Sequence, residues 1–129
     1  MKISFDFDST LSRKDVQSFV KDLIAVGHEV WIVTSRGSTG PALEKGWWWV
    51  EKQNADLFAV AESVGIPKDR IVFTEHADKI EYLDGKGFVV HVDDDPDELW
   101  AIVRSGDACG VVNVDNSDWK LHFSEICSI

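Results

Sequence analysis

The sequence predicts an α/β fold, a three-layer α/β/α, Rossmann-like domain with a central parallel sheet. Two observations support this prediction. Apolar, β-branched segments alternate with helical segments along the chain. The strand segments are also too apolar to be half exposed, which is typical of parallel strands covered on both faces. A chain of 129 residues is long enough for one domain with a real core, so we expect residues 1–129 to form a single domain.

Hydrophobic periodicity predicts the first three elements. Residues 2–5 (KISF) alternate between polar and apolar side chains, which predicts a strand. Residues 14–26 place apolar side chains at helical spacing, and Gly27 follows them as a stop signal. Residues 29–34 (EVWIVT) form a nearly continuous apolar run, which favours a buried strand.

Glycine and proline divide the middle of the chain. The GSTGP sequence breaks the chain after the second strand, and residues 43–64 have a helical pattern that ends at a GIP sequence. We then expect a short strand at residues 71–73 and a helix at residues 78–83.

The last part of the chain repeats the alternation. Residues 88–92 (FVVHV) predict a strand, and a helix is expected at residues 95–104. Asp95 is suited to the N-cap of this helix and Pro96 to its first position. Residues 110–114 predict a final strand, and the tail after them is ambiguous.

Polar residues gather where these strands end. In parallel sheets the ligand site lies beyond the carboxyl ends of the strands, near the point where the strand order reverses. Segments that are distant in sequence therefore meet at one crevice. The residues expected there are the acids Asp6, Asp8, Asp93 and Asp94, the hydroxyls of Thr34 and Ser35, and the amine of Lys79.

Asp6 and Asp8 raise an electrostatic question. In an extended strand, residues i and i+2 project to the same face, so these two carboxylates would lie side by side. A hard divalent cation is the simplest compensation, and magnesium prefers oxygen ligands. We therefore expect Mg²⁺ between the acids.

A magnesium-loaded crevice would suit a phosphate group. Lys79 and the hydroxyl of Thr34 would contact its oxygens. Asp6 can attack phosphorus as a nucleophile and form an aspartyl-phosphate. Asp8 can protonate the leaving oxygen and later deprotonate the attacking water.

The same motifs resemble a known family. The pieces DFDST, IVTSR, Lys79 and HVDDDP, in this order, are similar to the four signature motifs of the haloacid dehalogenase superfamily, and the likeness extends over residues 2–104. The resemblance implies that Asp6 is the nucleophile. It implies that Asp8 is the general acid/base and that its backbone carbonyl also binds magnesium.

The remaining motif positions carry over in the same way. The resemblance implies that Thr34 binds phosphate and that Lys79 stabilises both nucleophile and phosphate. It implies that Asp94 completes the metal shell, with Asp93 supporting the ligand or a bound water. The metal-binding residues expected are therefore Asp6, Asp8, Asp94 and Asp93. Thr10 matches the residue that braces the loop after the nucleophile.

The resemblance also implies a subclass. An aspartate at position 8 favours phosphoester hydrolysis, because an alkoxide leaving group needs a proton. Residues 11–33 and 35–78 are too short for an inserted cap domain, so we expect an open, capless site. In this family such a site goes with large substrates, such as proteins or nucleic-acid ends, or with an oligomeric partner that acts as a lid. IVTSRG followed by a Trp-rich segment is also weakly similar to the phosphatase part of polynucleotide kinases.

Other residues allow two interpretations. Arg36 is either a substrate clamp at the edge of the crevice or the partner of a surface acid. Three successive tryptophans, Trp47, Trp48 and Trp49, predict either a surface that stacks on a base or peptide or the contact of a homo-oligomer. We interpret His91 as a strand residue and expect no zinc site.

Function has alternatives too. The leading hypothesis is a magnesium-dependent phosphomonoester hydrolase. A second is a non-catalytic phospho-acceptor or phosphate-binding module that uses the same crevice. A third is an inactive scaffold. The substrate is expected to be a phosphorylated small molecule, a phosphoprotein or a nucleic-acid end.

Composition and net charge restrict the expected partners and cellular location. The net charge of −10 argues against general binding to nucleic acid through its phosphates. No run is long enough to span a membrane, and the N-terminal sequence lacks the apolar stretch of a signal peptide. The two cysteines, Cys109 and Cys127, are expected to be reduced thiols. We therefore expect a cytoplasmic protein without a membrane partner.

Overall fold

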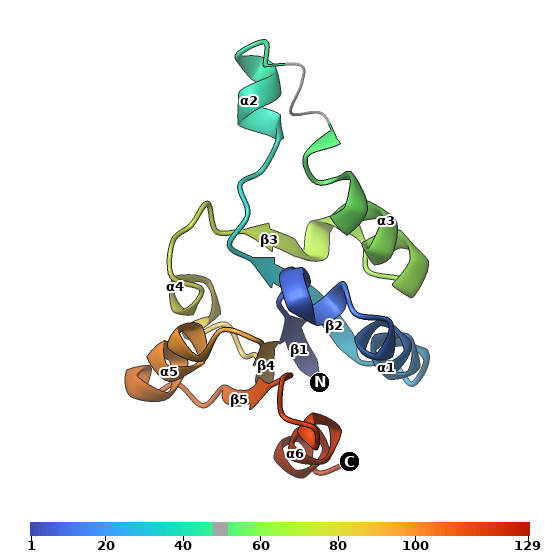
Figure 1. Ribbon diagram of the computed structural model, residues 1–129. Helices are drawn as coiled ribbons and strands as arrows, with labels where there is room; N and C mark the ends of the chain where they lie inside the picture. The colour runs from blue at the N-terminus through green and yellow to red at the C-terminus, as the bar shows by residue number, and fades with distance from the viewer. Residues whose placement is uncertain (48–51) are drawn as a thin grey trace.

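The described residues form a five-stranded sheet in the order β3-β2-β1-β4-β5, and all its strands run parallel (Figure 1). This computed structural model describes residues 1–47 and 52–129. The strands are β1 (Lys2–Phe5), β2 (Glu29–Thr34), β3 (Ile71–Phe73), β4 (Val90–Asp93) and β5 (Gly110–Asn113). The predicted parallel α/β fold is confirmed.

Helices cover both faces of the sheet and complete the three layers (Figure 1). One face carries α1 (Lys14–Ala25), α3 (Ala55–Val64) and α6 (Trp119–Cys127), and the other carries α4 (Ile80–Leu83) and α5 (Pro96–Ser105). Because side chains alternate along a strand, neighbouring residues of one strand can belong to different cores. Ile32 belongs to the first core and its neighbour Val33 to the second.

The chain winds in two directions from the central strand β1. It passes through α1 to β2 and through α3 to β3, then returns through α4 to β4 on the other side of β1. The strand order therefore reverses between β1 and β4. The backbone N–H of Asp6 donates to the carbonyl of Val92 (2.9 Å), which holds the two strand ends together. In folds of this kind the ligand crevice lies at this point.

The prediction of one continuous helix at residues 43–64 is wrong. Within the described residues, the structure has the short α2 (Gly40–Glu44) and, separately, α3 (Ala55–Val64). Gly46 adopts φ +83°, a left-handed conformation that ends a helix and that glycine adopts without steric cost. Figure 1 shows α2 projecting beyond the sheet.

The other predicted elements differ at their ends. Strand β4 begins at Val90, two residues later than predicted, and α4 begins at Ile80, with Lys79 as its N-cap. The helix predicted from Asp95 is α5, and Asp95 is its N-cap, because its side chain accepts a hydrogen bond from the N–H of Asp97 (2.9 Å). The ambiguous tail contains α6.

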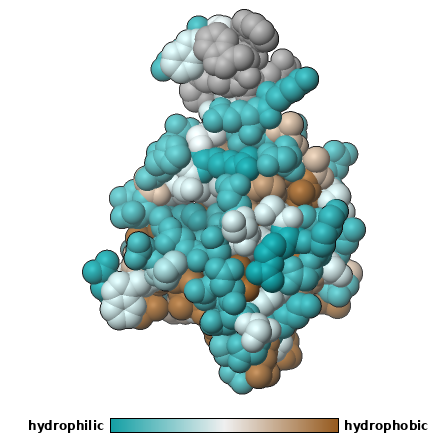
Figure 2. Space-filling view, viewed as in Figure 1, coloured by the Kyte–Doolittle hydropathy of each residue, from teal (hydrophilic) through white to brown (hydrophobic). Residues whose placement is uncertain are grey.

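The molecular surface bears on the predicted partners and location. The side of the molecule drawn in Figure 2 is mainly hydrophilic, with hydrophobic side chains in smaller areas. Trp47 is 45% exposed, whereas Trp48 and Trp49 lie outside the described residues, so the predicted tryptophan surface stays a prediction. Cys109 and Cys127 are free and buried. In the part of the chain that the structure describes, no helix combines the length and apolarity needed to cross a membrane.

Candidate active site

A crevice of about 240 Å³ lies where β1 and β4 end, at the reversal of strand order. Most of the residues predicted for the site line it together: Asp6, Asp8, Ser35, Lys79, Asp93 and Asp94. Ser9, Asp95 and Glu98 also line it. The predicted meeting of three strand ends with Lys79 therefore occurs in the structure.

Lys79 lies between two of the acids. Its Nζ is 2.9 Å from Oδ1 of Asp6 and 2.6 Å from Oδ2 of Asp93, and all three residues are buried. Its backbone N–H donates to Glu98 (2.9 Å), which ties the start of α4 to α5. The positive group that contacts Asp6 in the protein itself is thus the ammonium of Lys79, the residue that the resemblance placed beside the nucleophile.

Asp93 uses its full capacity as an acceptor. Its Oδ1 accepts the backbone N–H groups of Asp94 (2.9 Å) and Asp95 (3.1 Å), and its Oδ2 accepts from Lys79 and from His91 (2.8 Å). A carboxylate offers about four lone-pair sites, so these bonds fill it. Burial alone would raise the pKa of Asp93, but the hydrogen bond from His91 and the charge of Lys79 outweigh it, so the pKa lies below its ordinary value. Asp93 is therefore an ionised support, and its predicted role as a direct metal ligand would require one of these bonds to break.

A buried polar pair lies beneath Asp93, and the sequence analysis missed it. His91 and Ser4 are directly opposite each other on β4 and β1, fully buried, with Ser4 Oγ 2.7 Å from Nδ1 of His91. Burial lowers the pKa of His91, so its ring is neutral. Since Asp93 only accepts, Nε2 carries the hydrogen and Nδ1 accepts from Ser4. The sequence signal that could have predicted this pair was a serine and a histidine in otherwise apolar strands.

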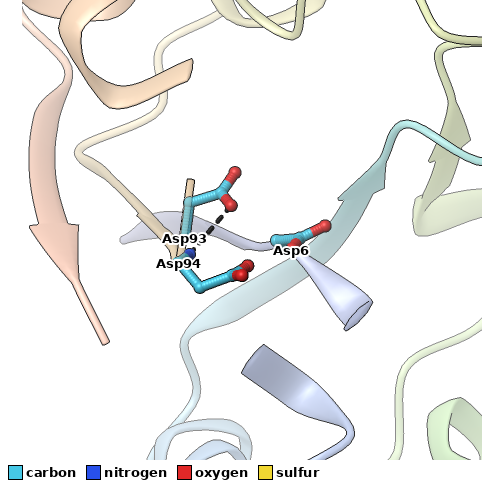
Figure 3. Close-up of side chains that lie close together, drawn as sticks. All are labelled: Asp6, Asp93 and Asp94. Atoms are coloured by element: carbon cyan, nitrogen blue, oxygen red, sulfur yellow. Dashed lines mark hydrogen bonds between the residues drawn. The ribbon is translucent and has the colours of Figure 1, made fainter. Parts of the chain in front are cut away.

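The protein compensates the negative charge of an ionised Asp6 only in part. Burial and then the charge of Asp93 raise the pKa of Asp6 to about 8, against the opposing effect of Lys79. Asp6, Asp93 and Asp94 each contribute one carboxylate oxygen to a cluster in which these oxygens lie within 4.8 Å of one another (Figure 3). Figure 3 shows the Asp6 and Asp94 carboxylates approaching from the ends of adjacent strands.

The oxygens of Asp6 and Asp94 fit a hard cation. Asp94 is half-buried, and Thr10, itself buried, donates to its Oδ1 (3.3 Å). One carboxylate oxygen of Asp94 belongs to the acidic cluster, and clustered carboxylate oxygens are the ligands that magnesium prefers. The bracing role predicted for Thr10 is consistent with this contact.

Asp8 does not lie beside Asp6 as predicted for an extended strand. The chain leaves β1 and enters a tight turn, η1 (Phe7–Leu11), in which Ser9 adopts φ +57°. The turn directs the Asp8 carboxylate toward Arg36, whose Nε and Nη2 donate to it at 3.0 and 2.7 Å. Asp8 lines the crevice but lies outside the cluster of three acids. Its predicted acid/base and metal-binding roles stay predictions.

Arg36 has no free donor. Besides its two bonds to Asp8, it makes two to Asp56 (2.8 and 3.0 Å) and one to Asn54 (3.4 Å). Its guanidinium carbon also lies 4.9 Å from the centre of the Phe7 ring. Of the two interpretations of Arg36, the structure has the ion pair, although one partner is an acid of the site. The sequence analysis missed Asn54 and Asp56.

The two hydroxyls after β2 are placed differently. Ser35 lines the crevice, whereas Thr34 is fully buried and is not among the lining residues. Thr34 Oγ1 accepts the backbone N–H of Arg36 (3.2 Å). Thr34 therefore shapes the turn that carries Ser35 and Arg36. Its predicted contact with phosphate stays a prediction.

The fold and the site together define an α/β protein of the Rossmann-like class with an acidic, lysine-containing crevice at the reversal of strand order. No protein-family model matches the sequence, and no curated protein matches it. One similar solved structure is that of an uncharacterized protein from Corynebacterium glutamicum. It is 15% identical and has a TM-score of 0.46, and the alignment covers 99% of this chain and 95% of that one.

Proposed function

We propose that this protein is a magnesium-dependent phosphomonoester hydrolase of the haloacid dehalogenase type that acts through an aspartyl-phosphate on Asp6. The observation that carries the proposal is Lys79, whose buried ammonium contacts both Asp6 and Asp93 beside the carboxylate of Asp94. A structural salt bridge would need one acid for one lysine. A cluster of three acids, two of them in contact with one lysine, leaves negative charge that suits a cation and then a phosphate.

The first chemical step uses the chain's own groups. An oxygen of the Asp6 carboxylate attacks phosphorus while the bond from phosphorus to the leaving oxygen breaks. The leaving alkoxide takes its proton from Asp8, which in its protonated form keeps only one of its two hydrogen bonds from Arg36. Lys79 contacts Asp6, so its charge is close to the group that is transferred.

The second step reverses these roles. A water gives its proton to the Asp8 carboxylate and attacks phosphorus, and the bond from phosphorus to Asp6 breaks. Inorganic phosphate leaves, and both aspartates return to their starting states. Magnesium held by Asp6 and Asp94, when bound, supplies positive charge that draws in the phosphate dianion and offsets the charge of the transition state.

One observation favours a second candidate, a phospho-acceptor module without turnover. The Asp8 carboxylate is engaged by Arg36 and lies outside the acidic cluster. If both Asp8 oxygens kept their bonds to Arg36, Asp6 could accept a phosphoryl group that no base then helps water to remove. In a phosphatase, one of these two bonds gives way to the reacting oxygen while the other holds Asp8 at the crevice. The two candidates differ in the lifetime of phosphorylated Asp6, which is short in a phosphatase and lasts for minutes in such a module.

The test is phosphate release from purified protein with Mg²⁺ and, separately, with EDTA. The substrates are p-nitrophenyl phosphate, sugar phosphates and nucleotides, a phosphopeptide, and DNA or RNA with a 3′-phosphate. We expect release only with the metal and none from Asp6→Asn. Asp22→Asn is the matched control, because Asp22 is an exposed residue of α1 away from the crevice. Full activity of folded Asp6→Asn would exclude the proposed mechanism.

A further inference from the structure

The strongest feature outside the acidic cluster is a double ion pair that joins three segments of the chain. Arg36 follows β2, Asp8 lies in the turn after β1, and Asp56 lies in the first turn of α3. We infer that Asp56 is a positioning residue: through Arg36 it fixes the carboxylate of Asp8 at the crevice. The inference rests on the proposed phosphatase function.

The geometry leaves the guanidinium little freedom. One edge of Arg36, formed by Nε and Nη2, donates to both oxygens of Asp8. The neighbouring edge, formed by Nη1 and Nη2, donates to both oxygens of Asp56. Paired planar contacts of this kind fix orientation as well as distance. Rotation of the guanidinium would break contacts with both acids at once.

The surroundings strengthen this arrangement. The guanidinium lies over the ring of Phe7, the residue between the two site aspartates. Asn54, which is 1% exposed, donates to the carbonyl of Gly37 (3.0 Å) and accepts from Arg36. The loop after β2 is thereby attached to the start of α3. Asp56 also accepts the backbone N–H of Leu57 (2.8 Å), which fixes its own carboxylate.

Asp8 needs such support because it has little of its own. Its side chain is 54% exposed, and the hydrogen bonds found for it among the described residues come from Arg36. An acid that must meet a leaving oxygen loses efficiency when it samples many orientations. The Arg36 side chain is 22% exposed, so it is the better ordered partner. Without Asp56, Arg36 would keep only its long hydrogen bond to Asn54 and its contact with the Phe7 ring besides Asp8, and Asp8 would be fixed less well.

This arrangement predicts an effect that depends on the leaving group. A p-nitrophenolate leaves readily without a proton, whereas an alkoxide needs one. Loss of Asp56 should therefore impair hydrolysis of an alkyl phosphate more than hydrolysis of p-nitrophenyl phosphate. A purely structural defect would lower both rates by the same factor.

The experiment compares wild type, Asp56→Asn and Arg36→Lys on p-nitrophenyl phosphate and glycerol 2-phosphate with Mg²⁺. For both variants we expect the ratio of kcat on the alkyl substrate to kcat on the aryl substrate to fall about tenfold, with KM nearly unchanged. Arg36→Lys keeps the charge but removes the two-edged contact. It also provides a second measurement should Asp56→Asn be unstable. Asp22→Asn should retain the wild-type ratio.

Three outcomes would overturn the inference alone: equal losses on both substrates, a rise in KM as the main effect, or a wild type that hydrolyses only the aryl substrate. A main effect on KM would instead assign Arg36 to substrate binding. A wild type without metal-dependent release from any phosphomonoester would overturn the proposed function, and the inference with it.

Discussion

At the scale of single residues, Asp6 determines how the site responds to pH. Its pKa is raised to about 8 by burial and by the charge of Asp93, whereas the ordinary value is 3.8. Without a metal, the folded protein therefore binds a proton at Asp6 more tightly than the unfolded chain does. The free energy of unfolding must then decrease as pH rises between about 4 and 8.

We expect this decrease in urea titrations of the protein in EDTA at several pH values across that interval. The slope due to one proton is at most about 1.4 kcal/mol per pH unit. Asp6→Asn, which cannot ionise, should remove that part of the slope. Parallel curves for wild type and Asp6→Asn would show that Asp6 has no such shift.

At the scale of elements, the pair formed by Ser4 and His91 links β1 to β4 beneath the crevice. The hydroxyl of Ser4 satisfies Nδ1 of His91, and Nε2 of that ring in turn supports Asp93. The pair belongs to neighbouring strands in direct register, so it needs no flexible segment to form. The pair therefore connects the rigid sheet to Asp93, the residue that holds Lys79.

Ser4→Ala should therefore destabilise the protein by about 1–3 kcal/mol, because it leaves a buried ring nitrogen without a donor. The free energy of unfolding in urea measures this effect. Ser18→Ala is a matched control, since Ser18 is exposed on α1 and alanine favours helices. Equal stability of Ser4→Ala and Ser18→Ala would mean that the buried hydrogen bond contributes nothing.

At the scale of the whole molecule, the sheet and the meeting of strand ends were predictable from sequence. Continuous apolar strands separated by glycine and proline are local signals, and parallel topology then brings Asp6 and Asp94 to one edge. The direction of the Asp8 side chain was not predictable in this way. It depends on the positive φ of Ser9, a non-glycine residue in a tight turn.

The contacts missed by sequence analysis share a physical origin. Arg36 and Asp56 come from segments on either side of α2, and their contact follows from where α3 packs. Residue spacing carries no information about such packing. The error in the helix predicted at 43–64 had a different cause. The apolar pattern of this segment indicated one continuous helix and outweighed the stop signal of Gly46. Fold class was therefore more predictable than the orientation of individual side chains.

Metal binding at the crevice should stabilise the whole fold, because the strand ends that hold Asp6 and Asp94 come together only in the folded chain. A ligand that binds only the folded state adds about 2.7 kcal/mol at a concentration of 100 Kd. We expect Mg²⁺ to raise the Tm of wild type measured by calorimetry and to have little effect on Asp94→Asn. Asp95→Asn is the neighbouring control, because asparagine preserves the N-cap of α5 while it removes an equal charge. If both variants lost the rise in Tm equally, general acidity of the crevice would explain metal binding better than a site built on Asp94.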